Sequence, residues 1–261
     1  MLKIGIDDTD SKRGGCTTYI AALLADELSK FADIKQVKLV RLNPNVPWKT
    51  RGNGSVCLEV RTQEVERTKA LTLEVVERNS VFEDEDTNPG VVFYGGEPTG
   101  ELHEFYHKAL TDIVKKEEAE ALASDHGAEL HGFKNGRGVI GALAAVGSAF
   151  EDDTYEIIAY RARDHWGEAR KVDEASVIAM DDATRPLTFN NYDPEYERML
   201  ITPRSPCPVL FGIRGEDPDI LSRAYEMIEV EEPGERTRFF RPNPGTDAHL
   251  VEVGRVADVK P

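Results

Sequence analysis

The chain has 261 residues, of which 40% are hydrophobic, 48 are acidic and 32 are basic, so its formal net charge is -16. This length gives room for one large or two ordinary domains, and the hydrophobic content is sufficient for a packed core. The acidic balance excludes a protein that coats nucleic acid through overall positive charge, although it permits a local basic groove.

The cysteine content and the hydropathy of the chain predict a cytoplasmic protein without a membrane partner. Cys16, Cys57 and Cys207 are too widely spaced for a Cys-x-x-Cys metal site or a disulfide framework. The N-terminus lacks a basic region followed by an apolar one, so no signal peptide is expected. The longest uncharged apolar stretch, residues 138–150, is shorter than the roughly 20 residues that cross a bilayer.

The first 28 residues predict a strand, an acidic turn, a glycine loop and a helix. Residues 2–6 alternate between apolar and other residues with the period of a strand, and residues 19–28 are apolar with helical spacing. Between them lie three aspartates, two glycines and two threonines: Asp7, Asp8, Asp10, Gly14, Gly15, Thr17 and Thr18.

This stretch has the residue types that phosphate chemistry needs. Clustered carboxylates repel each other unless a cation lies among them, so we expect all three aspartates to bind Mg²⁺. The glycines allow a tight turn that aims N–H groups at an anion, and the helix N-terminus adds further donors. Thr17 or Thr18 could cap the helix, contact Mg²⁺ or accept a phosphoryl group. The alternative is an Asp-rich turn whose side chains bond their own backbone, but the adjacent glycine loop and helix favour the phosphate site.

A cationic loop follows the predicted strand 34–42. Residues 43–54 contain two prolines, which block regular structure, together with Trp48, Lys49, Arg51 and Asn53. One interpretation is an ordinary turn anchored by a buried Trp48. The other is a phosphate or base clamp, since arginine binds phosphate and indole stacks on bases. The sequence leaves both open, with Lys49, Arg51 and Asn53 as candidate cofactor-binding residues.

The middle of the chain predicts alternating strands and helices around an acidic loop. We expect strands over 55–61 and 91–94, helices over 62–80 and 101–116 with a helical continuation to about 127, and an acidic loop over 82–90. Residues 136–141 match Gly-x-Gly-x-x-Gly, but residues 129–134 make a poor preceding strand, so a dinucleotide site is not expected. A basic glycine turn that leads into a small-residue helix over 139–149 explains the pattern better.

The C-terminal part predicts a ferredoxin-like domain. Strands are expected over 155–161, 209–216 and 236–241 and a helix over 219–228, while residues 162–200 are polar and irregular apart from a short segment at 176–180. The order from residue 138 suits helices on an antiparallel sheet. The predicted fold is α+β, with a kinase-like mixed α/β ATP domain over 1–132 and a ferredoxin-like domain over 133–261, and a boundary near 128–137.

Segments from end to end of the sequence resemble the archaeal 2-agmatinylcytidine synthetases, the TiaS family, which modify the wobble cytidine of the AUA-reading isoleucine tRNA. The segments are Gly5-Ile6-Asp7-Asp8-Thr9-Asp10 with Cys16-Thr17-Thr18, and residues 41–54, 86–90, 136–147, 206–216 and 246–250. The family normally continues into an oligonucleotide-binding barrel and a zinc ribbon. This sequence ends at Pro261 without cysteine pairs, so the resemblance covers the first two domains only, as in a fragment or a short relative.

The resemblance implies an ATP-dependent ligase that forms a carbon–nitrogen bond. The C2 oxygen of cytosine is phosphorylated, the amine of agmatine displaces it, and ATP ends as AMP. Thr17 matches the threonine that becomes phosphorylated, with Asp8 and Asp10 as further catalytic residues. Arg214 would steady the phosphates, and Glu216 would hold Arg214 or bind a second cation. ATP, Mg²⁺, the tRNA and agmatine are therefore the expected ligands.

Two other function classes fit the same residues. A metabolite kinase would use the Asp-Thr stretch without RNA, and a non-catalytic relative would bind nucleotide or RNA as a subunit. The sequence does not place agmatine, whose guanidinium needs a carboxylate and an aromatic or apolar wall. Glu151, Asp152 and Asp153 qualify, as do many other acids in the chain.

Overall fold

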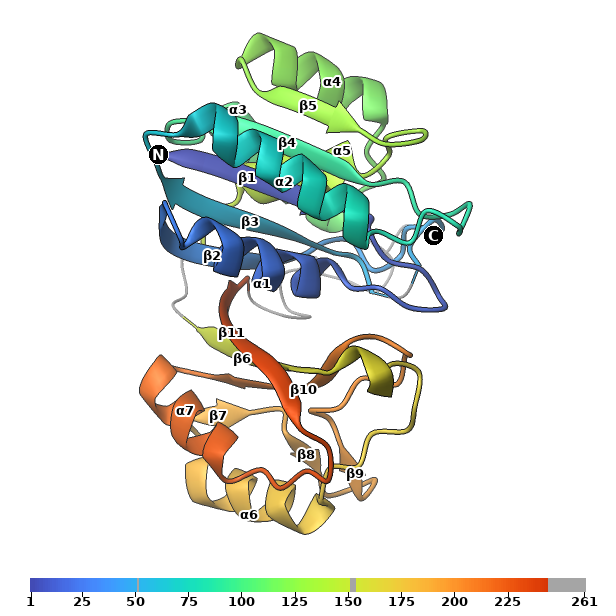
Figure 1. The fold of residues 1–261 in the computed structure, drawn as a ribbon, viewed down its shortest axis with the longest axis vertical. Helices are drawn as coiled ribbons and strands as arrows, with labels where there is room; N and C mark the ends of the chain where they lie inside the picture. The colour runs from blue at the N-terminus through green and yellow to red at the C-terminus, as the bar shows by residue number, and fades with distance from the viewer. Residues whose placement is uncertain (51, 151–153, 244–261) are drawn as a thin grey trace, which may run out of the picture.

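A nine-stranded sheet forms the frame of the protein in the computed structural model, which describes residues 1–50, 52–150 and 154–243 (Figure 1). The strand order is β5-β4-β1-β3-β2-β11-β6-β10-β7, and every neighbouring pair is antiparallel except β2 with β11. Its strands are β1 (Leu2–Asp7), β2 (Asp33–Arg41), β3 (Gly54–Arg61), β4 (Gly90–Gly95), β5 (Glu129–Gly132), β6 (Tyr155–Arg161), β7 (Thr188–Phe189), β10 (Val209–Gly215) and β11 (Gly234–Pro242). A separate small ribbon pairs β8 (Tyr192–Asp193) with β9 (Arg198–Met199).

Helices cover both faces of the N-terminal half of the sheet. One face carries α1 (Thr17–Leu28) and α2 (Val65–Asn79), and the other carries α3 (Gly100–Thr111), α4 (Lys116–Asp125) and α5 (Val139–Gly147). In the C-terminal half, α6 (Glu174–Thr184) contacts β7 and α7 (Pro218–Glu226) contacts β6 and β10. A short 3₁₀ helix spans Arg163–His165. Among the described residues, no helix is both long and apolar enough to pass through a lipid bilayer.

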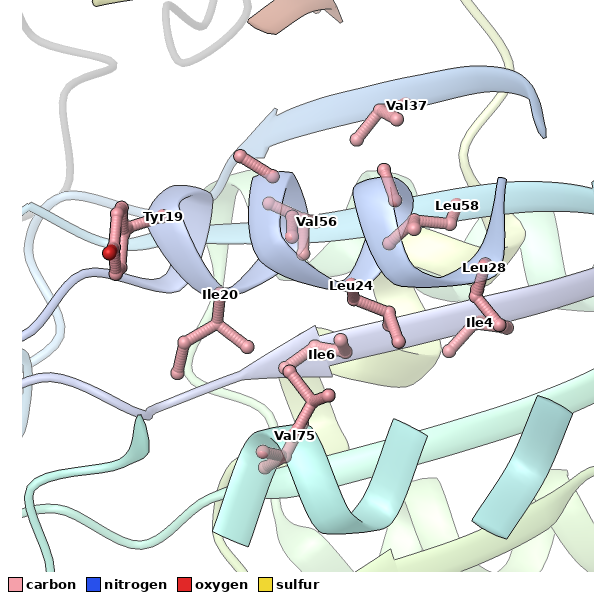
Figure 2. Close-up of a cluster of buried hydrophobic side chains, with 14 of the residues drawn as sticks. Ile4, Ile6, Tyr19, Ile20, Leu24, Leu28, Val37, Val56, Leu58 and Val75 are labelled. Carbon is pink, nitrogen blue, oxygen red and sulfur yellow. The ribbon is translucent and has the colours of Figure 1, made fainter. Parts of the chain in front are cut away.

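The two faces of β1 pack differently because its side chains alternate. Ile4 and Ile6 are fully buried against Leu24 and Leu28 of α1, with α2 closing the other side of this cluster (Figure 2). On the opposite face, a Cβ at Gly5 would lie 2.1 Å from the Ala142 carbonyl oxygen. The missing side chain therefore lets α5 lie directly on the strand, which confirms the predicted small-residue helix.

The C-terminal half confirms the predicted ferredoxin-like arrangement. Its elements run β6-α6-β7-β10-α7-β11, and its strands are ordered β11-β6-β10-β7 with antiparallel pairs throughout. Strand β11 also pairs in parallel with β2, at Arg241 opposite Lys38. One sheet therefore joins the two halves, and the fold is α+β as predicted. The division of the chain at residues 132 and 133 stays a prediction.

Three elements differ from the sequence expectation. Helix α6 is longer than the predicted segment 176–180, because Asp173 caps it by accepting a hydrogen bond from the Ser176 amide at 2.7 Å. The predicted continuous helix over 101–127 is broken at Asp112, whose backbone is extended, into α3 and α4. The poor strand over 129–134 does form β5, since an edge strand needs only one partner, here β4.

Candidate functional site

A cleft of about 900 Å³ opens at the edge of the sheet where β1 and β2 end. Both strands are antiparallel to β3, so they run in the same direction and bring Asp7 and Arg41 to one edge. The cleft is also lined by Ser205 and Arg214 from the ferredoxin-like half. The two halves of the molecule therefore share one concave site, which is the usual setting for a small-molecule pocket.

Asp7 and Asp8 are carboxylates that the fold holds out of water. Asp7 ends β1 and lies under α5, where a Cβ at Gly141 would approach its Oδ2 atom to 1.9 Å. Burial, reinforced by Asp8, raises the pKa of Asp7 to about 8. Burial also raises the pKa of Asp8 to about 6, although the guanidinium of Arg137 opposes this shift. Arg137 donates to the Asp8 Oδ2 atom from Nη2 at 2.8 Å and from Nε at 3.1 Å.

Asp10 faces two loops rather than its fellow aspartates. Its Oδ1 atom accepts a hydrogen bond from the Thr50 hydroxyl at 2.7 Å, and its carbonyl accepts one from the Thr87 hydroxyl at 2.7 Å. Asp8 adopts a left-handed backbone with φ 58°, which turns the chain between β1 and this contact. All three aspartates line the cleft, but they point to different neighbours.

The aspartates fit a magnesium ion that shares its coordination with a substrate. Within the described ranges, no group of three or more His, Cys, Asp or Glu side chains is placed to hold a metal ion. The structure therefore does not gather Asp7, Asp8 and Asp10 into one ligand set, because Asp8 faces Arg137 and Asp10 faces Thr50. Mg²⁺ usually takes one or two carboxylates plus phosphate oxygens and waters. The buried charge of Asp7 and Asp8 suits such a site.

The N-terminus of α1 faces the cleft with its amide groups available. Within this fully described helix, the N-cap residue Cys16 makes no side-chain cap and no acidic residue lies in the first turn. The hydroxyl of Thr17 lies 3.0 Å from that of Thr9, and the hydroxyl of Thr18 lies 3.0 Å from the Cys16 sulfur. Cys16, Thr17 and Thr18 all line the cleft. Uncapped amides at a positive helix end form an anion site.

The two glycines shape the turn before α1 and do not themselves line the cleft. Gly15 has a left-handed φ of 75°, and a Cβ there would lie 2.7 Å from a methyl group of Val81. The Gly14 carbonyl accepts a hydrogen bond from the Ser11 amide at 2.8 Å, which closes the turn. Their expected contact with a cofactor therefore stays a prediction, while their conformational role is visible.

The loop over 43–54 forms one wall of the cleft. Lys49 and Asn53 line it, and the Asn53 side chain donates to the Asn43 carbonyl at 2.9 Å, which fixes the base of the loop. Trp48 also lines the cleft and is 50% exposed, so the interpretation of this residue as a buried anchor is wrong. Arg51 lies outside the described residues, as do the three acids suggested for agmatine, residues 151–153.

Arg214 reaches the cleft, but Glu216 does not. The Arg214 Nε atom donates to the Glu156 Oε2 atom at 3.2 Å, whereas Glu216 is exposed and absent from the cleft lining. Strand β10 ends at Gly215, and the Glu216 amide bonds the Leu187 carbonyl at 3.0 Å, which turns its side chain out of the strand alternation. The expected role of Glu216 in holding Arg214 is therefore filled by Glu156.

Sequence reasoning missed three charged residues that the fold brings to this site or its rim. Arg137 lies in the basic glycine turn before α5, and Arg41 and Glu156 form an ion pair between β2 and β6. A usable signal existed for Arg137, because an arginine between two glycines is typical of an anion-binding turn. No local signal connects Arg41 with Glu156, which lie 115 residues apart.

Two family models match the chain. The model described as the TiaS TCKD domain matches residues 3–135, and the model described as the TiaS FLD domain matches residues 136–249. Among curated proteins, the chain is similar to two with the name 2-agmatinylcytidine synthetase TiaS, which that name assigns to an isoleucine tRNA. The one from Thermococcus sibiricus is 46% identical over 100% of this chain and 61% of its own length. The one from Methanocaldococcus jannaschii is 47% identical over 100% of this chain and 63% of its own length.

Solved structures give the same picture. A crystal structure of TiaS in complex with its isoleucine tRNA and ATP has a TM-score of 0.91 with this chain at 41% identity, over 96% of this chain and 60% of that one. A crystal structure of TiaS with the same tRNA, AMPCPP and agmatine has a TM-score of 0.89 at 39% identity, over 96% and 61%. The chain therefore spans about three fifths of the length of the relatives it matches.

Proposed function

This chain belongs to the TiaS family, whose domain models together match residues 3–249, and we propose that it carries out ATP-dependent transfer of agmatine to the wobble cytidine of the AUA-reading isoleucine tRNA. Relatives that are 46% and 47% identical carry the name of this activity. Because the chain covers 61% and 63% of those relatives, the activity, substrates and partners of the whole protein are part of this proposal.

One observation carries the proposal on structural grounds. The first turn of α1 presents uncapped amides and the Thr17 hydroxyl to the same cleft that Asp7 and Asp8 line. Amides at a helix N-terminus bind phosphate oxygens, and carboxylates recruit a cation that bridges such oxygens. A hydroxyl between an anion site and a cation site is placed to receive a phosphoryl group.

The proposed reaction has two displacement steps at the cytidine. The C2 oxygen of cytosine attacks the γ-phosphorus of ATP, and ADP leaves. The primary amine of agmatine then attacks C2, the phosphate departs with the oxygen, and the amine loses a proton. Phosphorylation is needed because a carbonyl oxygen is a poor leaving group and phosphate is a good one. The cleft helps by orienting the reacting groups and by stabilising charge on the phosphate.

The residues of the cleft take the following roles in the proposal. Thr17 is the phosphoryl acceptor in the protein, and transfer of a second phosphoryl group to it accounts for AMP as the final nucleotide. Thr18 with the α1 amides binds phosphate. Lys49, Arg51 and Asn53 hold the nucleotide from the opposite loop, and Arg214 steadies the phosphates. Gly14 and Gly15 keep the turn before α1 open to the nucleotide. Agmatine, as a cation, is drawn to the acidic side of the cleft.

A magnesium ion would be held by Asp7, Asp8 and Asp10 together with the phosphates of ATP. When bound, it neutralises charge on the transferring phosphoryl group. The protein groups then need to hold the aspartates in place, which Arg137 does for Asp8 and Thr50 does for Asp10. Because the proposed substrate is a tRNA, we expect the protein to act in the cytoplasm.

The proposal is tested by incubating the full chain with ATP, labelled agmatine and a transcript of the AUA-reading isoleucine tRNA. We expect agmatine label in the RNA. With γ-labelled ATP and no RNA, label on the protein without any transfer of agmatine would support a kinase of another substrate. Neither ATP turnover nor protein labelling would support a binding relative and contradict the proposal.

Substitutions at Thr17 and Asp8 sharpen this test. Thr17→Ala and Asp8→Ala are each expected to lower turnover by about 10²–10³-fold or more, as when a group that stabilises a transition state is removed, while the fold is retained. Thr17→Ser keeps a hydroxyl and is expected to retain measurable turnover. Glu83→Gln, an exposed acid of the loop over 82–90, is the matched control and should leave turnover unchanged. Full turnover by Thr17→Ala would remove the acceptor role.

A further inference from the structure

Two arginines from opposite halves of the molecule share one buried carboxylate at the cleft. Arg41 ends β2, whereas Arg214 lies on β10 directly beside Glu156 on β6. Arg41 donates from Nη2 to the Glu156 Oε2 atom, and Arg214 donates from Nε to the same atom at 3.2 Å. Both arginines line the cleft. We call Arg41, Glu156 and Arg214 the arginine pair with its shared carboxylate.

The charges of this group do not balance. Burial alone would raise the pKa of Glu156, but the two arginines lower it, so the carboxylate stays ionised. Two guanidinium groups against one carboxylate leave an excess of one positive charge. Arg214 is itself half-buried beside Arg41, and burial with this like charge lowers its pKa. An anion between the two arginines would relieve their repulsion.

One hydrogen-bond donor of the group is also unused. The Arg41 Nη1 atom is buried and has no hydrogen-bond partner among the described residues. A buried donor without a partner costs free energy that a ligand oxygen recovers. The side chains of Arg41 and Arg214 are 21% and 32% exposed, so part of each guanidinium faces the open cleft. A clamp that only joined the two halves would need neither the exposure nor the second arginine.

The group is separate from the anion site at α1. β3 lies between β1 and β2 in the sheet, so Arg41 and Asp7 are roughly 10 Å apart across two strand spacings of about 4.8 Å. One phosphate cannot contact both ends of that span. A ligand with a second phosphate can, and arginine forks match the oxygens of such a group.

We propose that Arg41 and Arg214, held together by Glu156, form a second phosphate-binding subsite of the cleft. The inference rests on the proposed function, because it adds a subsite to the site where phosphoryl transfer is proposed. The shared chemistry is a phosphate group, and it could come from the nucleotide or from the backbone of a bound RNA strand. The test below separates these two sources.

The test is equilibrium binding by calorimetry of Mg-ATP, adenosine and a stem-loop RNA with the isoleucine anticodon to the full chain. Arg41→Gln and Arg214→Gln are each expected to weaken one phosphate-bearing ligand about tenfold or more and to leave adenosine unchanged. A loss confined to ATP assigns the subsite to the nucleotide. A loss confined to the RNA, with a shallower salt dependence by about 0.7–0.9 per contact, assigns it to the RNA backbone. Arg223→Gln, at an exposed arginine of α7, is the matched control.

Folding of the variants is checked separately. Because Arg41→Gln changes the partners of a buried carboxylate, the double variant Arg41→Gln/Glu156→Gln restores charge balance and is expected to be more stable in urea than the single variant. It is still expected to lose phosphate affinity. Wild-type affinity for both ATP and RNA in Arg41→Gln and Arg214→Gln, or no binding of either ligand by the unchanged protein, would overturn the subsite. Agmatine transfer without any such loss would leave the proposed function standing and the subsite refuted.

Discussion

The two ends of β1 carry opposite kinds of charge cluster on the same face of the sheet. At the start of the strand, the Lys3 ammonium lies 2.7 Å from the Glu59 Oε1 atom, and the Lys38 ammonium lies 3.0 Å from that atom. Lys38 also donates to the Ser148 carbonyl at 2.8 Å. Burial alone would raise the pKa of Glu59, but these lysines and Gln36 lower it to about 2. The protein itself satisfies every charge of this cluster that the hydrogen bonds describe.

At the end of the same strand, the charges are left for a partner to satisfy. Burial raises the pKa of Asp7 to about 8 and that of Asp8 to about 6, and Arg137 compensates only part of the shift. Lys3 and Asp7 are four residues apart, so they point to the same side of β1 and under the same layer of helices. The difference teaches that burial alone does not mark a functional site. A buried cluster whose charges the protein leaves unbalanced does.

Removing the carboxylate of the balanced cluster should have the largest effect on stability. Glu59→Gln is expected to lower the free energy of unfolding at pH 7 by about 3–5 kcal/mol, because two buried lysines lose their partner. The pKa of Glu59 is lowered from 4.5 to about 2 in the folded protein, so its contribution is present above pH 4.5 and is lost as pH falls toward 2. Urea unfolding at pH 7 and pH 3 should show the gap between wild type and variant shrinking.

The matched control for this change is Glu64→Gln. Glu64 pairs with Arg67 at 2.8 Å on the surface, with side-chain exposures of 48% and 60%, so its loss should cost at most about 1 kcal/mol. Equal effects of Glu59→Gln and Glu64→Gln would contradict the account of the cluster around Lys3 as a major contributor to stability.

A methyl group at Gly141 should disturb the unbalanced cluster directly. A Cβ there would lie 1.9 Å from the Asp7 Oδ2 atom and 3.0 Å from a methyl group of Leu42. Gly141→Ala is therefore expected to lower the free energy of unfolding by about 1–3 kcal/mol, as overpacking does, and to weaken Mg-ATP binding. Gly100→Ala in α3 is the control, because its Cβ meets nothing within 4 Å. Unchanged stability and nucleotide binding in Gly141→Ala would refute the placement of Asp7 under α5.

Neutralising Asp7 should have the smallest effect and the opposite sign. Asp7→Asn keeps the shape of the side chain and removes a charge that burial disfavours, so the ligand-free protein is expected to gain about 1 kcal/mol of stability. The additional thermal stabilisation by Mg-ATP should disappear. Asp26→Asn is the contrasting control, because Asp26 pairs with Arg236 at 2.5 Å and also contacts Arg238, so its loss should lower stability. A lower melting temperature for ligand-free Asp7→Asn would mean that the carboxylate is satisfied within the protein.

The sequence by itself determined the elements that hold the aspartates. Alternation over residues 2–6 and helical spacing over 19–28 predicted β1 and α1, and the small residues of 139–147 predicted a helix packed closely on a sheet. These features are local, because periodicity and residue size act within one element. The ferredoxin-like order of the C-terminal strands followed from the same kind of pattern, and the short α6 helix was underestimated because its few apolar residues give a weak periodicity.

Only the tertiary structure decided which charged residues meet. Arg137 contacts Asp8 across 129 residues, and Arg41 contacts Glu156 across 115 residues. Periodicity assigns a side chain to a face of its strand, but it does not say which strand lies next to it. The sheet order places β11 between β2 and β6, and this long-range pairing brings the cleft's arginines together. For the same reason Glu216, two residues from Arg214 in the sequence, turned out to be a solvent-facing acid rather than its partner.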